Sequence, residues 1–436
     1  MIKKLVLVFI AIFAIQLYAQ EGTASLYSFY GIGSQKFKGT AENRSMGGLS
    51  IYTDSIHVNL RNPASYATPN LTYFNNESRP IKFSVGSSYS SLNLKSTNNT
   101  DNASAVSFDY LAMSIPMGKF GFGFGIMPST AVGYKLDNNN TAGDLLNRFQ
   151  GEGGLNKAFL GFGYQIVNGL SVGVDAQYNF GNVQNSIIEF VYDDDDVPLQ
   201  YQSKETNRAD LSGLNFNLGL SYKQMLNEKL EIVSGVTYSI ESKLSSKNER
   251  SYSTILYDRS TGDEFVYSNL DVDLEALGLK ETDLILPSKV SVGLGVGQPR
   301  KWFVGTEYLF QNTSNLKNVI LSSGNNATFK DASTISFGGF YIPEYNSFTS
   351  YFKRVVYRGG VYVEDTGLTI NNEDVKEFGM SFGVGLPVGD VFSNVNIGLE
   401  IGKRGSTNSN LIQENFINLQ LSLSLNDKWF GKHKYD

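Results

Sequence analysis

Hydrophobic and polar residues alternate one by one along much of the chain. The pattern is clearest in 214–220 (LNFNLGL), 378–386 (FGMSFGVGL), 394–401 (NVNIGLEI) and 417–425 (INLQLSLSL). Side chains two residues apart lie on the same side of a β-strand. Each stretch therefore predicts a strand with one apolar face and one face of small or polar residues.

Fourteen such strands are expected, an even number. Most of them reach the ~9–11 residues that a tilted strand needs to cross a bilayer. The expected strands are 81–94, 104–116, 120–135, 155–166, 170–191, 205–222, 230–242, 288–298, 301–311, 332–343, 354–364, 377–387, 394–403 and 415–425.

The predicted connections alternate between long and short, as in outer-membrane barrels with short periplasmic turns and longer extracellular loops. The longest, 243–287, is expected to contain its own hairpin, around 252–257 and 264–268, and a helical turn near 274–279. The acidic run 193–196 is best explained as a solvated loop tip, although its oxygens could hold Ca²⁺. A soluble secreted β protein with the same alternation is the alternative.

The predicted fold is all-β: a transmembrane antiparallel barrel of fourteen strands over residues 71–428, preceded by a segment, 20–70. A closed barrel pairs every backbone N–H and C=O group, which the interior of a bilayer requires. Residues 1–19 contain Lys3 and Lys4, an apolar run and a terminal alanine, and are predicted to be a secretory signal peptide. Residues 429–436 form a polar tail.

Composition narrows the classes of function. The chain has 436 residues, no cysteine, 18% charged residues and a formal net charge of -6. The missing cysteines exclude disulfides and Cys-ligated metals, and the acidic balance argues against nucleic acid as a partner. The two histidines, His57 and His433, lie in no catalytic motif, and no cofactor or metal signature is present. We therefore expect no enzyme activity, no cofactor and no metal site.

The segment before the first strand contains Ser45, Met46, Gly47 and Gly48, followed by Asn62, Pro63 and Ala64. This arrangement resembles the FadL-like outer-membrane transporters, in which a similar segment with an Asn-Pro-Ala element folds into the barrel as a hatch. The resemblance covers nearly the whole chain. It implies passive uptake of hydrophobic or amphipathic small molecules in the outer membrane of a Gram-negative bacterium, in contact with lipid and lipopolysaccharide.

Pro128 interrupts the predicted third strand, where a proline removes a ladder hydrogen bond. FadL-like transporters have a kink in that strand, which opens the wall for lateral exit of the ligand, and Pro128 is similar in position. A local bulge without a role in transport is the alternative. Asp109, Asp175, Glu307 and Glu400 fall on the small or polar faces and are expected to point into the lumen.

The C-terminal third is similar to FadL-like proteins of the Bacteroidota, in stretches such as 357–360 (YRGG) and 426–430 (NDKWF). That group includes a subunit that blocks the periplasmic mouth of the type 9 secretion translocon. The resemblance therefore also implies a second function: an occluded barrel that plugs or supports a large translocon subunit.

Overall fold

A computed structural model describes residues 22–54, 56–67, 81–140, 143–195, 197–258, 261–316, 327–388 and 393–427. The predicted signal peptide and the polar tail lie outside the described residues, as do residues 68–70 of the predicted lumen segment. None of the helices within these ranges has the length and apolar character to span a membrane.

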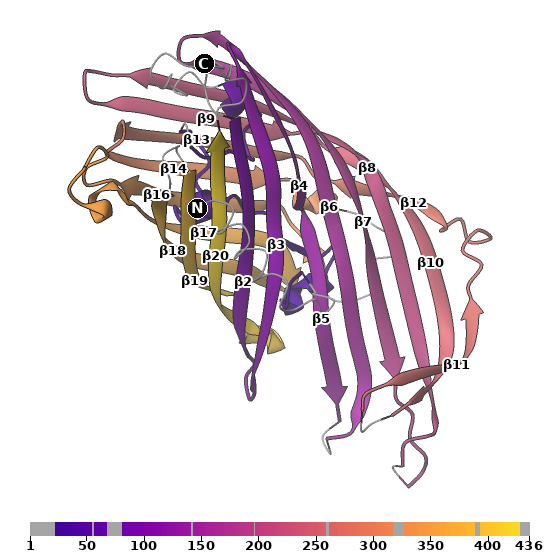
Figure 1. Cartoon of the computed structure of the whole chain (residues 1–436). Helices are drawn as coiled ribbons and strands as arrows, with labels where there is room; N and C mark the ends of the chain where they lie inside the picture. Colours follow the sequence, from indigo (N-terminus) through magenta and orange to yellow (C-terminus); the bar gives the residue numbers. More distant parts are fainter. Residues whose placement is uncertain are drawn as a thin grey trace, which may run out of the picture.

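The strands form a closed antiparallel barrel (Figure 1), in which β20 pairs with β2 from Asp427 opposite Ile81 to Gln413 opposite Lys95. The wall consists, in order, of β2 (Ile81–Lys95), β3 (Thr100–Met117), β4 (Phe120–Pro128) with β5 (Thr130–Asn139), β6 (Leu145–Val167), β7 (Leu170–Glu189), β8 (Tyr201–Met225), β9 (Glu231–Ser239) with β10 (Ser242–Tyr257), β12 (Glu281–Leu286) with β13 (Lys289–Gln298), β14 (Trp302–Gln311), β15 (Ala327–Phe329) with β16 (Ala332–Tyr341), β17 (Val356–Ile370), β18 (Glu373–Val388), β19 (Ser393–Arg404) and β20 (Gln413–Asp427).

Within the described part of the chain, four wall strands are built from two segments each, so that the wall has the fourteen strands predicted from the sequence. The remaining elements are short. They are η1 (Leu26–Phe29), β1 (Ser34–Gln35), α2 (Ala41–Arg44), η2 (Pro63–Ala67), β11 (Glu264–Asp271), η3 (Thr313–Asn315), η4 (Tyr351–Arg354) and η5 (Asn408–Asn410).

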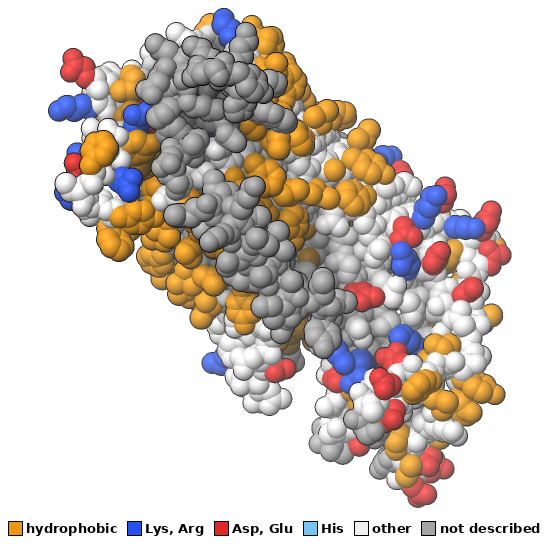
Figure 2. Space-filling view, viewed as in Figure 1, with side chains coloured by type: hydrophobic (Ala, Val, Ile, Leu, Met, Phe, Trp, Pro, Cys, Tyr) orange, Lys and Arg blue, Asp and Glu red, His pale blue; other side chains and the backbone are white. Residues whose placement is uncertain are grey.

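The two faces of each strand meet different surroundings. On β18, Phe378, Met380 and Phe382 are exposed on the outside, whereas Ser381 between them is fully buried on the inside. Similar rows on the neighbouring strands form a band of hydrophobic side chains over the barrel, with charged side chains toward its ends (Figure 2). This band has the character of a lipid-facing surface, and the fold is that of outer-membrane barrels.

The band gives a first prediction. Leu399 is the central one of three exposed apolar residues on β19, so replacing it with arginine is expected to cost about 2–4 kcal/mol of barrel stability in lipid. Tyr252 is somewhat more exposed than Leu399, at 46% against 37%, but lies on β10, whose outward residues 243–249 include two lysines and a glutamate. The Tyr252→Arg variant serves as the control and should be unchanged. Urea unfolding in phospholipid vesicles measures the stability of both variants. If the two variants are equally stable, the band does not face lipid.

Several strands extend further than the sequence predicted. Strands β6 and β8 contain 23 and 25 residues, and β10 continues the wall through residues that were predicted to be loop. The hairpin expected within 243–287 is present, with β10 pairing to β11 as far as Tyr257 opposite Glu264. Outside lipid the outer face of these extensions needs no apolar side chains, whereas their inner face carries buried apolar residues such as Leu244, Ile255 and Leu284.

The third wall strand is broken where the proline stands. Pro128 is the last residue of β4, Ser129 belongs to neither segment, and β5 follows. Beyond this point β3 and β5 do not pair: β4 pairs with β3 only between Leu111 and Met117, and β5 pairs with β6 and β1. In the described residues, the ladder between β3 and the third wall strand therefore ends near Pro128.

Candidate functional site

Residues 22–54 and 56–67, together called the N-terminal segment here, run through the inside of the barrel and contact the inward faces of the wall strands (Figure 1). The chain is mostly irregular. Its α2 helix has a capping box, in which Thr40 Oγ1 accepts from the Asn43 N–H and Asn43 Oδ1 accepts from the Thr40 N–H. The cap satisfies buried backbone donors and fixes where this short helix begins.

Arg44, at the end of α2, is held by a buried carboxylate of the wall. Its Nη2 lies 2.6 Å from Oε2 of Glu400 on β19. Glu400 also accepts from the Tyr362 hydroxyl at 2.6 Å and from Gln420 Nε2 at 3.0 Å. Both charges are almost completely buried and are paired, as buried charges must be.

Arg61 forms a second tie between the segment and the wall. Its Nη2 lies 2.7 Å from Oε1 of Glu307 on β14. The same carboxylate accepts from the Ser50 N–H at 2.7 Å and from the Ser291 hydroxyl at 2.6 Å. Glu307 therefore binds the segment at two places eleven residues apart.

Lys38 forms a third tie, to β17 and β18. Its Nζ lies 2.7 Å from both Glu364 and Glu377. Glu377 in turn pairs with Arg404 at 2.6 Å. The Tyr362 hydroxyl lies 2.6 Å from both Glu377 and Glu400, and its single proton can be donated to only one of them at a time. The network continues into that around Glu400 through this shared tyrosine.

The predicted Ser45-Met46-Gly47-Gly48 element packs backbone against backbone on the wall. The Gly47 N–H donates to Ser381 Oγ at 2.8 Å, and Gly47 adopts φ 70°, a conformation that favours glycine. A Cβ atom added to Gly338 or Gly360 of the wall would overlap the backbone of Met46. Glycines on both sides are thus required for this close approach.

The predicted Asn62-Pro63-Ala64 element sits in the same way on β7 and β8. Asn62 Nδ2 donates to the Leu220 carbonyl at 3.0 Å, and its Oδ1 accepts from the Ala64 N–H at 3.0 Å. Gly173 of the wall lies so close to Pro63 that a Cβ atom there would overlap its carbonyl carbon. The element is a turn that packs closely against a glycine of the barrel wall.

The four predicted lumen carboxylates are all buried, but the structure distributes them over separate clusters. Glu307 and Glu400 bind the N-terminal segment as described above. Asp109 on β3 accepts from the Ser88 and Ser107 hydroxyls at 2.9 Å. Asp175 on β7 lies 3.5 Å from Asn217 Nδ2. They do not form one site.

His57, the histidine of the segment, is buried and oriented by Asp54. Its Nδ1 lies 2.7 Å from Asp54 Oδ2, and Lys82 Nζ donates to the backbone carbonyls of both residues. Burial raises the pKa of Asp54, but the imidazole of His57 and the ammonium of Lys82 outweigh it and hold that pKa well below its usual range. The pair stabilises the turn between α2 and η2.

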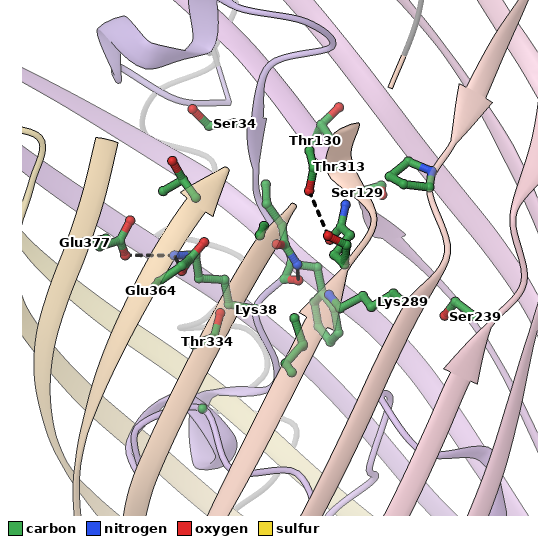
Figure 3. Close-up of a pocket in the computed structure, with 18 of the residues that line it drawn as sticks. Ser34, Lys38, Ser129, Thr130, Ser239, Lys289, Thr313, Thr334, Glu364 and Glu377 are labelled. Atoms are coloured by element: carbon green, nitrogen blue, oxygen red, sulfur yellow. Dashed lines mark hydrogen bonds and ion pairs between the residues drawn. The ribbon is translucent and has the colours of Figure 1, made fainter. Parts of the chain in front are cut away.

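Above the segment, the lumen contains a cavity of about 350 Å³. Its lining combines apolar side chains with many polar and charged ones, several of which Figure 3 labels. Its charged residues are Lys38, Arg44, Arg61, Lys157, Lys289, Arg404, Glu307, Glu364, Glu377 and Glu400. The described residues include no group of three or more His, Asp and Glu side chains suited to a metal ion.

A family model described as BamG matches residues 1–436. The chain belongs to the BamG family. No curated protein sequence matches it.

Solved structures of hydrocarbon channels share the fold. The Pseudomonas putida toluene transporter TodX has a TM-score of 0.58 at 15% identity, covering 89% of this chain and 99% of its own. The monoaromatic hydrocarbon channel CymD has a TM-score of 0.54 at 14% identity, covering 90% and 98%. A Pseudomonas aeruginosa FadL homologue has a TM-score of 0.55 at 11% identity, covering 91% and 99%. At these identities the likeness establishes a FadL-like barrel fold.

Sequence reasoning did not find the cations that meet the buried carboxylates. Arg44, Arg61 and Lys38 lie in an irregular segment with no alternation, and each finds its carboxylate more than 240 positions away. One signal was present in the sequence: four cations, Lys36, Lys38, Arg44 and Arg61, lie at irregular spacing in a segment predicted to enter the lumen, where buried cations require carboxylates in the wall.

Proposed function

We propose that the protein mediates passive uptake of small amphipathic compounds across the outer membrane, with the N-terminal segment as its hatch. One observation carries the proposal: a FadL-like barrel encloses a lumen cavity of about 350 Å³, bounded by the wall and by this segment. Cavities of this size accept small-molecule ligands. The charged lining favours a ligand with a polar end over a pure hydrocarbon.

In the proposed mechanism the compound enters from the extracellular side and rests in the cavity. Movement of the hatch then releases it. The break after Pro128 offers a lateral route as well, because β3 and β5 do not pair beyond it. Two of the four lumen carboxylates, Glu307 and Glu400, would fix the closed position of the hatch through the arginines they hold.

Uptake by purified protein tests the proposal. Liposomes containing the barrel should take up radiolabelled decanoate several times faster than liposomes without protein, and unlabelled decanoate should compete. Liposomes carrying an unrelated closed barrel of similar strand number control for leakage through the lipid. Equal rates in all three preparations would contradict uptake of this class of compound.

A second candidate function is an occluded barrel that plugs or supports a larger subunit, such as a type 9 secretion translocon. The close packing of residues 46–48 and 62–64 on wall glycines favours it, because a permanently closed lumen needs such contacts. Affinity purification from native membranes separates the two candidates. Recovery of the barrel in stoichiometric association with a large outer-membrane protein would favour the second, and recovery alone the first.

A further inference from the structure

The cavity has two chemically different sides. On one side, Lys38 lies between Glu364 and Glu377, so that its charge is compensated (Figure 3). The opposite side contains Lys289 and Ser239 in the same view, and no carboxylate forms an ion pair with Lys289 among the described residues. The excess positive charge of the cavity is therefore concentrated on the second side.

A row of hydrogen-bonding side chains crosses this second side from strand to strand. Asn217 on β8 is directly opposite Ser239 on β9, Ser239 is opposite Lys289 on β13, and Lys289 is opposite Gln311 on β14. Directly opposed side chains on one face lie about 5 Å apart. All four line the cavity, and they form a continuous polar shelf on the inner wall.

Lys157 on β6 and Asn179 on β7 are directly opposite each other and line the same cavity, so they are counted with the shelf. The residue of β7 opposite Asn217 is Asp175, and Asn179 lies four residues further along β7. Asn179 is 2% exposed, and its Nδ2 has no hydrogen-bond partner. Lys157 forms no ion pair among the described residues, although it interacts with Asp175 at longer range. Among the described residues the buried Asn179 amide thus lacks an acceptor, and the Lys157 ammonium, 5.8 Å from the centre of the Phe37 ring, lacks an ion pair.

The cations of the shelf also interact with one another. Arg61 and Lys157 both lie close enough to Lys289 to oppose its charge, while Glu307 and Glu364 attract it without forming an ion pair. Arg61 is paired with Glu307, but two lysines without an ion pair and a buried donor without a partner are costly unless an acceptor satisfies them. Hydrogen bonds that involve a charged group are the strongest of their kind.

We propose that this shelf, centred on Lys157, Asn179 and Lys289, binds the anionic group of a small ligand, a carboxylate or a phosphate. The amides and hydroxyls along the row would bind neighbouring polar atoms of the same molecule. The proposal deepens the proposed function by naming the charge of the transported compound. It concerns equilibrium binding, so a barrel that binds anions but transports nothing would overturn only the uptake proposal.

Binding to the full-length barrel in a non-ionic detergent tests the site. Calorimetric titrations compare decanoate with decanol, and glucose 6-phosphate with glucose, so that each anion has an uncharged counterpart. We expect at least one anion to bind roughly tenfold or more tightly than its counterpart, and the pair that differs shows whether the anion is carried on an acyl chain or on a sugar. If neither anion binds more tightly than its uncharged counterpart, the proposal is overturned.

Substitutions locate the site. Lys157→Met and Lys289→Met, singly and together, are expected to weaken the anion roughly tenfold or more each, whereas Lys289→Arg should retain binding. Lys243→Met is the matched control, because Lys243 is 71% exposed on β10 and pairs with Asp283 outside the cavity. If both single variants bind the anion as tightly as the unsubstituted barrel does, the assignment is overturned. If the double variant does not fold, the single variants decide.

Discussion

Replacing Glu400 with glutamine is expected to release the N-terminal segment from the wall. The change leaves Arg44 buried without its charge partner, which costs about 3–5 kcal/mol for a buried ion pair. The opening equilibrium of the segment should then rise at least about hundredfold. Trypsin measures it, because Arg44 and Arg61 become cleavage sites as soon as the segment leaves the lumen.

The control for this prediction is Asp283→Asn, which removes an ion pair with Lys243 that is exposed on both sides. Such exposed pairs contribute little to stability, so the cleavage rate should not change. If the Glu400→Gln barrel resists trypsin as well as the unsubstituted one, Glu400 does not hold the segment in place.

Replacing Gly360 with valine is expected to have an effect of similar size by a steric route. A Cβ atom at Gly360 would overlap the backbone of Met46 and Gly47, and backbone cannot move aside as a flexible side chain can. Overpacking of this kind costs about 1–3 kcal/mol or more. The segment should be displaced while the wall stays intact, so the barrel should show conductance steps in a planar bilayer that the unsubstituted protein lacks.

The neighbouring residue supplies the control. A Cβ atom at Gly359 would approach nothing closer than the Ser381 carbonyl oxygen, at 3.9 Å. Gly359→Val introduces the same side chain one position along the same strand, on the opposite face. Equal conductance of the two variants would show that contact with residues 46 and 47 does not close the lumen.

The strands could be predicted from the sequence because alternation is a local property. The apolar positions of 378–386 and 417–425 indicate both the strand and the side that faces lipid. The prediction was wrong where alternation stopped being informative: residues 145–154 and 243–251 were expected to be loop but are strand. Outside lipid both faces can be polar, so no pattern distinguishes an extended strand from a polar loop.

The candidate site could be predicted only in part. The inward position of Asp109, Asp175, Glu307 and Glu400 follows from strand alternation, and the structure places all four inside. Their partners did not follow, because an irregular segment has no period from which to infer which side chain meets which strand. The ligand shelf was missed for a related reason: Lys157 and Lys289 lie on strands β6 and β13, and face one cavity only after the barrel has closed.

The sequence by itself determined the class of the fold, the number of wall strands and which side of each strand meets lipid. These follow from residues that are near one another along the chain. The tertiary structure alone decided how Arg44, Arg61 and Lys38 hold the N-terminal segment, and which side of the lumen keeps cations without carboxylate partners. These groups come together only when the barrel closes. Because an unpaired charge is costly in a buried interior, the cations of the N-terminal segment pair with carboxylates that lie across the lumen and far away in the sequence.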